Sequence, residues 1–142
     1  MAAELVVPPP HVAEMLTLPD GGRAVRRHRI TFRDDLPAEI STSWHAAKVA
    51  ERAPLLTKKE RIRQGTLAYV ESSTGRRARH AHDRVAARLA TEEELKTFGL
   101  TGPAAVLVVR HVVYDMDERP LEFAEAVYPP DAWTYEELYV IH

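Results

Sequence analysis

The feature that most constrains the fold of this chain is an internal repeat with an offset of 83 residues. The repeated positions are Arg27-His28 and Arg110-His111, Asp34 and Asp117, and Pro37-x-Glu39 and Pro120-x-Glu122. Each unit reads as a helix, a glycine-containing turn, a strand, an acidic turn, a proline and a second strand. Short dipeptides also match by chance, but here five positions agree in one register. The repeat predicts two related halves, each a helix followed by an antiparallel hairpin.

Local patterns supply the remaining elements. We expect a short helix over 10–16, strands over 23–33 and 38–45, a short helix or irregular link over 44–53, and a hairpin from the strands 104–114 and 121–128. The apolar run 104–114 is expected to be a central strand that is buried on both faces. The arginine-rich stretch 76–90 is expected to be a long strand, with a helix over 84–90 as the alternative. A last strand is expected over 134–141.

Two capping-box patterns, in which a Thr is followed three residues later by a Glu, predict helix starts. In a capping box the Thr hydroxyl and the Glu carboxylate satisfy free backbone N–H groups. Thr57-x-x-Glu60 predicts a helix that carries Tyr69 on one side, and Thr91-x-x-Glu94 predicts a helix that ends at Gly99. Together these elements predict an α+β domain with a mostly antiparallel sheet of about six strands and helices packed on it.

Composition narrows the class of protein. A chain of 142 residues, 45% hydrophobic and 28% charged, fits a single globular domain over 1–142. It has no cysteine, so disulfides, thiol nucleophiles and cysteine-based zinc sites are excluded. No apolar run is long enough to span a bilayer, and the first ten residues do not resemble a secretory signal, so a cytoplasmic location is expected. The net charge of −2 argues against nucleic-acid binding by this chain alone.

Charge is unevenly distributed along the sequence. Arginines crowd the segments 23–33 and 76–88, and the chain is acidic from Asp115 onward. Two interpretations remain open: cross-strand charge pairing on a solvated face, or arginines that converge on an anionic ligand. No motif predicts a cofactor or a metal. His80 and His82 share strand spacing without a third ligand, and neither a catalytic-serine elbow nor a glycine-rich phosphate loop occurs.

The ordered motifs resemble the UTRA domain, the effector-sensing domain of HutC-type regulators in the GntR superfamily, whose fold is similar to that of chorismate lyase. The resemblance covers about residues 7–140. It rests on Pro10-His-Val-Ala-Glu-Met-Leu, on Asp34-Asp-Leu-Pro37 through Trp44, on the segment 85–95, and most specifically on the segment 108–131. The chain departs from the family pattern where the turn glycines are Asp35 and Glu118, and where a usual carboxylate is Ala86. The family's winged helix-turn-helix DNA-binding domain is absent from this chain.

The spacing of five residues suggests a ligand site. Arg77 and Arg79 point to one face if they lie on a strand, and two guanidinium groups side by side can hold a phosphate or carboxylate. Glu122 and Tyr128 share a face with alanines between them, which leaves room for a ligand, and Ser43 can add a hydroxyl. The resemblance implies that the arginine pair clamps the effector and that Glu122, Tyr128 and Ser43 line the pocket. The alternatives are surface charge pairing of the arginines and Glu122, and an ordinary strand-surface serine.

These observations predict a small-molecule sensor that binds an anionic metabolite and does not catalyse a reaction. We expect a homodimer, and DNA binding only through a winged helix-turn-helix domain outside this chain. Two alternatives stay open: a chorismate-lyase-like enzyme acting on a small carboxylate, and a stand-alone protein-interaction module.

Overall fold

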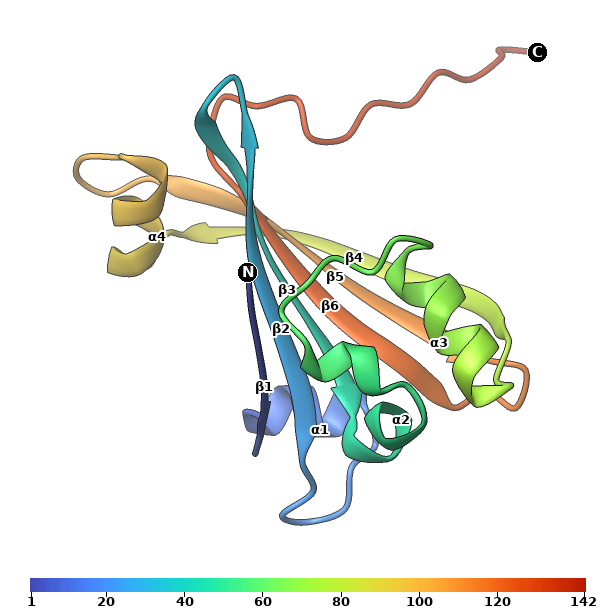
Figure 1. Ribbon diagram of the computed structural model, residues 1–142. Coiled ribbons are helices and arrows are strands. Elements are labelled where there is room, and N and C mark those ends of the chain that lie inside the picture. Colours follow the sequence, from blue (N-terminus) through green and yellow to red (C-terminus); the bar gives the residue numbers. More distant parts are fainter.

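The computed structural model describes all 142 residues. The chain forms one twisted antiparallel sheet with helices on both faces (Figure 1). The sheet order is β1-β2-β3-β6-β5-β4. The strands are β1 (Ala2–Val6), β2 (Ala24–Arg33), β3 (Leu36–Ala46), β4 (Ala78–Leu89), β5 (Ala105–Asp115) and β6 (Pro120–Tyr128). The helices are α1 (Pro10–Met15), α2 (Ala47–Arg52), the 3-10 turn η1 (Pro54–Thr57), α3 (Thr66–Thr74) and α4 (Glu92–Phe98). The α+β class and a mostly antiparallel sheet of about six strands, as expected from the sequence, are confirmed, with five of the expected strands among the six. No helix is long and apolar enough to cross a membrane.

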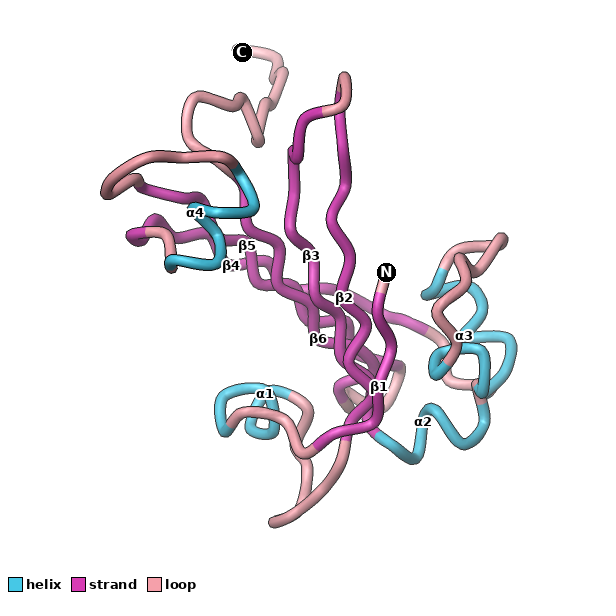
Figure 2. Tube along the Cα trace, turned by 60° about the vertical axis from the view of Figure 1, so that its left-hand side comes forward, coloured by secondary structure: helices cyan, strands magenta, loops and turns pink.

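The two predicted halves are α1-β2-β3 and α4-β5-β6, and their inner strands β3 and β6 pair at the centre of the sheet. Helices α1 and α4 lie on the same face, and α2 and α3 lie on the other (Figure 2). Each repeated helix contacts the inner strand of the opposite half: α1 contacts β6, and α4 contacts β3. The halves are therefore related by an approximate two-fold axis through the sheet.

The strand register refines the sequence repeat. Thr31 pairs with Glu39 in the first hairpin, and Val113 pairs with Glu122 in the second. The inner strands thus correspond at an offset of 83 and the outer strands at an offset of 82. This shift arises because the second turn is one residue longer. The Arg27 position therefore corresponds to Val109, and the dipeptide match of Arg27 with Arg110 is not a structural equivalence.

The core is divided between the two faces. On the α1 and α4 face, Trp44, Phe123 and Val112 pack with α1, while Val106, Val108 and Val127 pack with Phe98 of α4. On the other face, α2, η1 and α3 bury Leu56, Val70, Val113 and Leu121 at one end of the sheet. The opposite end of that face has no helix over it. This face of the sheet is therefore covered by helices at one end and open at the other, beside α3.

Four sequence expectations need correction. The capping box at Thr57 opens no helix, because the Thr57 hydroxyl donates to Pro54 O (2.8 Å) and Lys58 is extended; α3 begins only at Thr66. Residues 134–141 form no strand, since no strand of the chain pairs with them. The strand β1 was not expected. Strand β5 is not buried on both faces throughout: Val112 and Val113 are, but Leu107 and Val109 are half-buried because nothing covers that end.

The remaining local expectations hold. Thr91 and Glu94 form a complete capping box at α4, and the stretch 84–89 is strand rather than helix. The turns that lack the family's glycine place non-glycine residues at positive φ: Asp35 has φ 63° and Glu118 has φ 60°. This left-handed backbone costs energy for any residue with a Cβ atom.

Candidate functional site

The open face carries a hollow whose floor is made of small side chains on the two central strands. Ser41 and Ser43 of β3 lie opposite Ala126 and Ala124 of β6. A pocket of about 150 Å³ opens over this floor, and its lining includes Arg27, Arg29, Ser41, Ser43, Thr66, Glu122 and Ala124. The small residues leave space that larger side chains would fill. Because Thr66, the first residue of α3, is also in its lining, the pocket lies between the sheet and the start of α3.

Arg27 fixes the position of the segment 58–65, which forms the roof of this pocket. Its buried guanidinium donates to the carbonyl oxygens of Leu56 (2.7 Å), Lys58 (2.6 Å) and Glu60 (3.1 Å). The bonds to Lys58 and Glu60 occupy carbonyl oxygens that a helix starting at Thr57 would use for its own hydrogen bonds, which disfavours that helix. Burial, followed by the charge of Arg29, lowers the pKa of Arg27. The segment 58–65 is thereby held across the sheet, and the start of α3, which follows it, lies beside the pocket.

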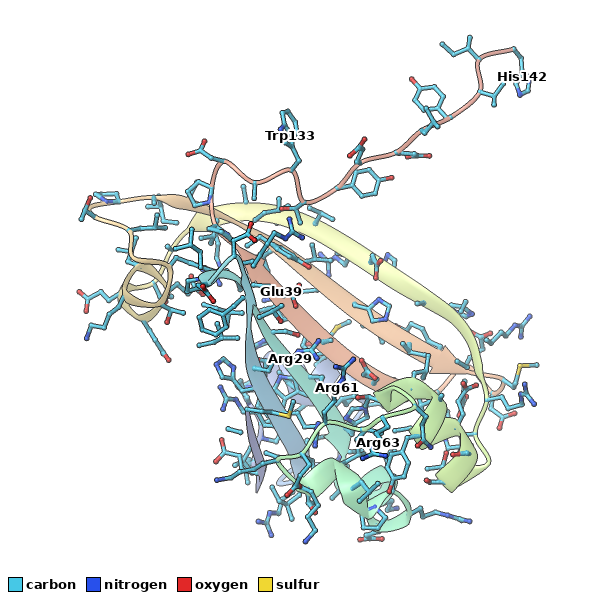
Figure 3. All side chains as sticks on the ribbon, turned by 45° about the horizontal axis from the view of Figure 1, so that its top comes forward. Arg29, Glu39, Arg61, Arg63, Trp133 and His142 are labelled. Atoms are coloured by element: carbon cyan, nitrogen blue, oxygen red, sulfur yellow. The ribbon has the colours of Figure 1, made fainter.

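Three further arginines are exposed and can contact a ligand. Arg29 lies on β2 two residues beyond Arg27, and Arg61 and Arg63 lie on the roof segment. All three are exposed, and none forms an ion pair. In the view of Figure 3, Arg29 and Arg61 are drawn over the sheet, and Arg63 is drawn beside α2 and α3. Unpaired guanidinium groups around a concave surface favour the binding of a carboxylate or a phosphate.

The inner end of the pocket holds a carboxylate–imidazole pair. Nε2 of the fully buried His45 lies 3.2 Å from Oε2 of Glu122, whose side chain is 14% exposed. Burial raises the pKa of Glu122, but the hydrogen bond with His45 and the charges of His45 and His111 outweigh it, so the pKa is lowered overall. Nδ1 of His45 is buried and has no partner. Glu122 is therefore an ionised acceptor at the inner end of the pocket.

The other end of the small-residue floor carries a related pair. Burial, followed by the charge of Glu39 and a hydrogen bond with it, raises the pKa of Tyr128 to about 12. Between the two ends, His111 of β5 contacts Asp83 of β4 on the same face. The floor thus runs from His45 and Glu122, past the serines and alanines, to Glu39 and Tyr128.

The structure brings some of the predicted site residues together and separates others. Ser43 and Glu122 line the pocket. Tyr128 shares their face but lies at the far end of the floor, where it lines a different hollow beside Pro37 and Trp133. Arg77 and Arg79 lie at the start of β4, away from the pocket; both are exposed, and Arg79 pairs with Glu118 (3.1 Å). A bulge between Ala78 and His80 also breaks the regular alternation expected there.

Sequence reasoning missed Arg29, Arg61, Thr66 and His45. The pair Arg27 and Arg29 has the same spacing as Arg77 and Arg79, so spacing alone does not separate the two pairs. The register separates them, because Arg27 lies directly opposite Ser43. Nothing in the local sequence marked Arg61, which is placed by the bonds of Arg27.

A larger hollow, about 660 Å³, is at the other end of the sheet, between the loop 16–23, the start of α2 and the β5–β6 turn. It is mainly apolar, and two arginines in its lining are already engaged. Arg76 binds Asp115 (2.8 Å) and Arg119 binds Asp117 (3.3 Å). No three His, Asp or Glu side chains are placed to hold a metal ion. Arg23 and Lys48 also line the large hollow and form no ion pair, so free charge alone does not separate the two sites. The small pocket is distinguished by its floor of serines and alanines beside Glu122.

Comparison with known proteins gives the family. The UTRA domain model matches residues 1–134, and the chain belongs to the UTRA family. No curated protein matches the sequence significantly. Among solved structures, a GntR-family transcriptional regulator from Bacillus cereus superposes with a TM-score of 0.82 at 19% identity, over 99% of this chain and 95% of that one.

The effector domain of PhnF from Mycobacterium smegmatis superposes with a TM-score of 0.80 at 18% identity, over 99% of this chain and 85% of that one. A longer PhnF structure gives a TM-score of 0.77 at 18% identity, over 100% of this chain but only 61% of that one. These likenesses establish a fold shared with GntR-family regulators.

Proposed function

We propose that this domain is the effector sensor of a GntR-family transcription regulator and that its effector is a small anionic metabolite. Membership of the UTRA family and the fold shared with the PhnF effector domain support the sensor role. The observation that carries the anionic effector is the unpaired Arg29 in the lining of the pocket, with the unpaired Arg61 and Arg63 on the neighbouring segment 58–65.

The chemistry of the pocket suggests how the ligand is held. The acid group of the metabolite meets Arg29 and Arg61 and accepts a hydrogen bond from Ser43. The first turn of α3 supports the same charge, because its N-cap Gly65 has no side chain to occupy the free N–H groups. At the inner end, the ionised Glu122 accepts hydrogen bonds from a ligand hydroxyl or amine.

Sensing requires that the effector prefer one conformation of the protein. The roof segment 58–65 is the element best placed to respond, because it carries Arg61 and Arg63 and is held to the sheet by the bonds of Arg27 and by the buried Ile62. In the complete regulator, we propose that this preference is coupled to a winged helix-turn-helix domain in the cytoplasm and to a homodimer of sensors.

The test is a thermal-shift screen with sugar phosphates, amino acids and organic acids. A true effector raises the melting temperature in a concentration-dependent way; a 100-fold excess over its Kd adds about 2.7 kcal/mol to the free energy of unfolding. The variant Arg29→Gln/Arg61→Gln should lose the shift while keeping its unliganded melting temperature.

A matched variant, Arg77→Gln/Arg79→Gln, decides between the two arginine pairs. The ligand role of Arg77 and Arg79 stays a prediction from the sequence, and loss of the shift in this variant alone would support it against the site proposed here. If no anion shifts the melting temperature, the proposed effector class is wrong. Conversion of a stabilising compound, followed by NMR, would indicate an enzyme instead.

A further inference from the structure

The large hollow of about 660 Å³ has the shape and the lining of a small-molecule site, and it shares no lining residue with the effector pocket. Three separate segments enclose it: the loop that follows α1, the start of α2 and the β5–β6 turn. Its apolar side chains include Leu16, Leu18, Pro19, Ala47, Val49 and Pro120. A concave, mainly apolar surface with a few polar groups is typical of sites that bury the body of a small ligand.

The walls of the large hollow are fixed by hydrogen bonds within the chain. Arg76 donates to the carboxylate of Asp115 (2.8 Å) and to the carbonyl oxygen of Pro120 (3.0 Å), which ties the β5–β6 turn to the segment before β4. On the other side, the backbone N–H of Ala47 donates to the carbonyl oxygen of Arg23 (2.9 Å) and joins the start of α2 to the start of β2. The hollow is therefore preformed, which lowers the entropy cost of binding a ligand there.

Two cationic side chains in the lining have no anionic partner. Arg23 donates to the carbonyl oxygen of Leu5 (3.2 Å) and forms no ion pair, and Lys48 forms none either. Both residues are exposed. Because Lys48 directly follows Ala47, the backbone bond between Ala47 and Arg23 brings the two cationic residues into neighbouring positions. Two such donors side by side favour the binding of a carboxylate.

The remaining charges of the lining limit the charge of the ligand. Arg76 and Arg119 are already paired with carboxylates. Glu118 is paired with Arg79 (3.1 Å), whereas Glu51 has no cationic partner. The unpaired groups are thus two cations and one anion. A ligand with a single acid group neutralises them, and a second acid group would leave an excess of negative charge.

Thr17 adds a polar group in an unfavourable backbone conformation. It follows Leu16, the C-cap of α1, and has φ 55°, a left-handed conformation that favours glycine and is strained for a β-branched side chain. Its presence adds a hydroxyl and a methyl group to the lining of the large hollow. Strain of this kind is concentrated at ligand sites, where the side chain contributes to binding.

We propose that the large hollow is a second ligand site and that it binds a small apolar monocarboxylic acid. The hydrocarbon body packs against Leu18 and Val49, and the carboxylate lies between Arg23 and Lys48. This ligand differs in chemistry from the effector, because the effector pocket has a polar floor of serines and a buried glutamate. The proposal does not depend on the effector pocket.

The first experiment is an NMR titration of the full chain, labelled with nitrogen-15, with sodium octanoate. Saturable shifts are expected at the backbone amides of the lining, with Gly22 and Ala47 as reporters. The affinity should fall about 4-fold for each methylene group removed in the series down to butyrate. Neutral octanamide should bind about 10-fold more weakly than octanoate, because it lacks the charge that Arg23 and Lys48 neutralise.

Two results of this titration overturn the proposal. If neither octanoate nor phenylacetate shifts the amides of the lining at about 10 mM, the large hollow does not bind this class of ligand. If octanamide binds as tightly as octanoate, the hollow is an apolar surface that does not recognise an acid group, as expected for a contact with another protein.

The second experiment places the acid group. Arg23→Gln/Lys48→Gln should weaken octanoate binding about 10-fold and leave octanamide binding unchanged, which also shows that the variant is folded. Arg52→Gln/Lys96→Gln removes the same two kinds of charge from exposed positions outside the lining and should have no effect. Unchanged octanoate affinity in the Arg23→Gln/Lys48→Gln variant would overturn the assignment of the acid group.

A further variant separates the two ligand sites. Arg29→Gln/Arg61→Gln, which alters the effector pocket, should leave octanoate binding and the shifts at Gly22 and Ala47 unchanged. Loss of octanoate binding in this variant would place the acid in the effector pocket and overturn the second site. The sensor role could then still hold, so the two proposals fail separately.

Discussion

Glu39 and Glu122 occupy equivalent positions in the two hairpins, and each carboxylate meets an aromatic ring of the facing central strand. Glu122 lies with its Oε2 3.2 Å from Nε2 of His45, and Glu39, opposite Tyr128, helps raise the pKa of that phenol. His45 and Tyr128 are themselves 83 residues apart, the offset of the inner strands. The small-residue floor therefore has two related ends, but only the end at His45 lies beneath the roof held by Arg27.

The lowered pKa of Glu122 predicts a pH dependence of stability. Because its pKa is lower in the folded chain than in the unfolded chain, its contribution is fully present above the ordinary value of about 4.3 and is lost as the pH falls through the folded value. Urea unfolding of Glu122→Gln should therefore show a smaller loss of stability below about pH 4.5, with a cost near neutral pH of about 1–3 kcal/mol. Glu51→Gln, on the exposed side of α2, is the control. Equal acid slopes for Glu122→Gln and the unaltered chain would contradict the assignment.

Arg27 and Arg29 are predicted to have separate roles despite their adjacent positions on one face. Arg27→Leu removes the donor to the carbonyls of Leu56, Lys58 and Glu60 and should lower the free energy of unfolding by about 2–4 kcal/mol. Arg29→Leu removes an exposed side chain without a partner and should change it by less than about 0.5 kcal/mol. Chemical denaturation of the two variants measures this difference. Similar losses in both would show that Arg29 also supports the fold.

The two capping-box patterns provide a matched pair of substitutions. Thr91→Ala should cost about 1 kcal/mol, because the Thr91 hydroxyl accepts a hydrogen bond from the N–H of Glu94 at the start of α4. Thr57→Ala should cost much less, since its hydroxyl donates only to the Pro54 carbonyl in an exposed turn. Denaturation midpoints give the comparison. A larger loss for Thr57→Ala would contradict the observed start of α3 at Thr66.

The β2–β3 turn predicts a stabilising substitution. Asp34 and Asp35 both have positive φ, and a two-residue turn of this kind favours glycine at the second position. Asp35→Gly should therefore add up to about 1 kcal/mol, which corresponds to roughly 2–5 °C in the melting temperature of a domain of this size. Asp35→Ala should lower it. Calorimetry at neutral pH measures both variants, and a decrease for glycine would show that the Asp35 side chain contributes more than its backbone conformation costs.

The parts of the fold that depend on nearby residues could be predicted from the sequence. The hairpin turns, the capping box at Thr91 and the apolar strand β5 all follow from contacts within a few residues. The capping box at Thr57 failed for a long-range reason, because Arg27 from another strand binds the carbonyls of Lys58 and Glu60 that a helix would use. Strand β1 is likewise defined by its pairing with β2, which no pattern within residues 2–6 reveals.

The candidate site was only half predictable for the same reason. Ser43 and Glu122 could be found because they follow the alternation of their own strands. The choice between two equally spaced arginine pairs requires the register of β2 against β3, and the position of Arg61 requires the bonds that fold the segment 58–65 back over the sheet. Both depend on residues that are distant in the sequence.

The approximate two-fold axis also has a consequence for protein engineering. Residues 47–75, which carry α2, η1 and α3, occur once, between the duplicated units, whereas residues 129–142 form no helix. One end of the floor therefore lies under the segment 58–65, while the equivalent end at Glu39 has no such segment over it. Adding an equivalent segment over the Glu39 end would test whether this duplicated fold can bind two different ligands, one at each end of the floor.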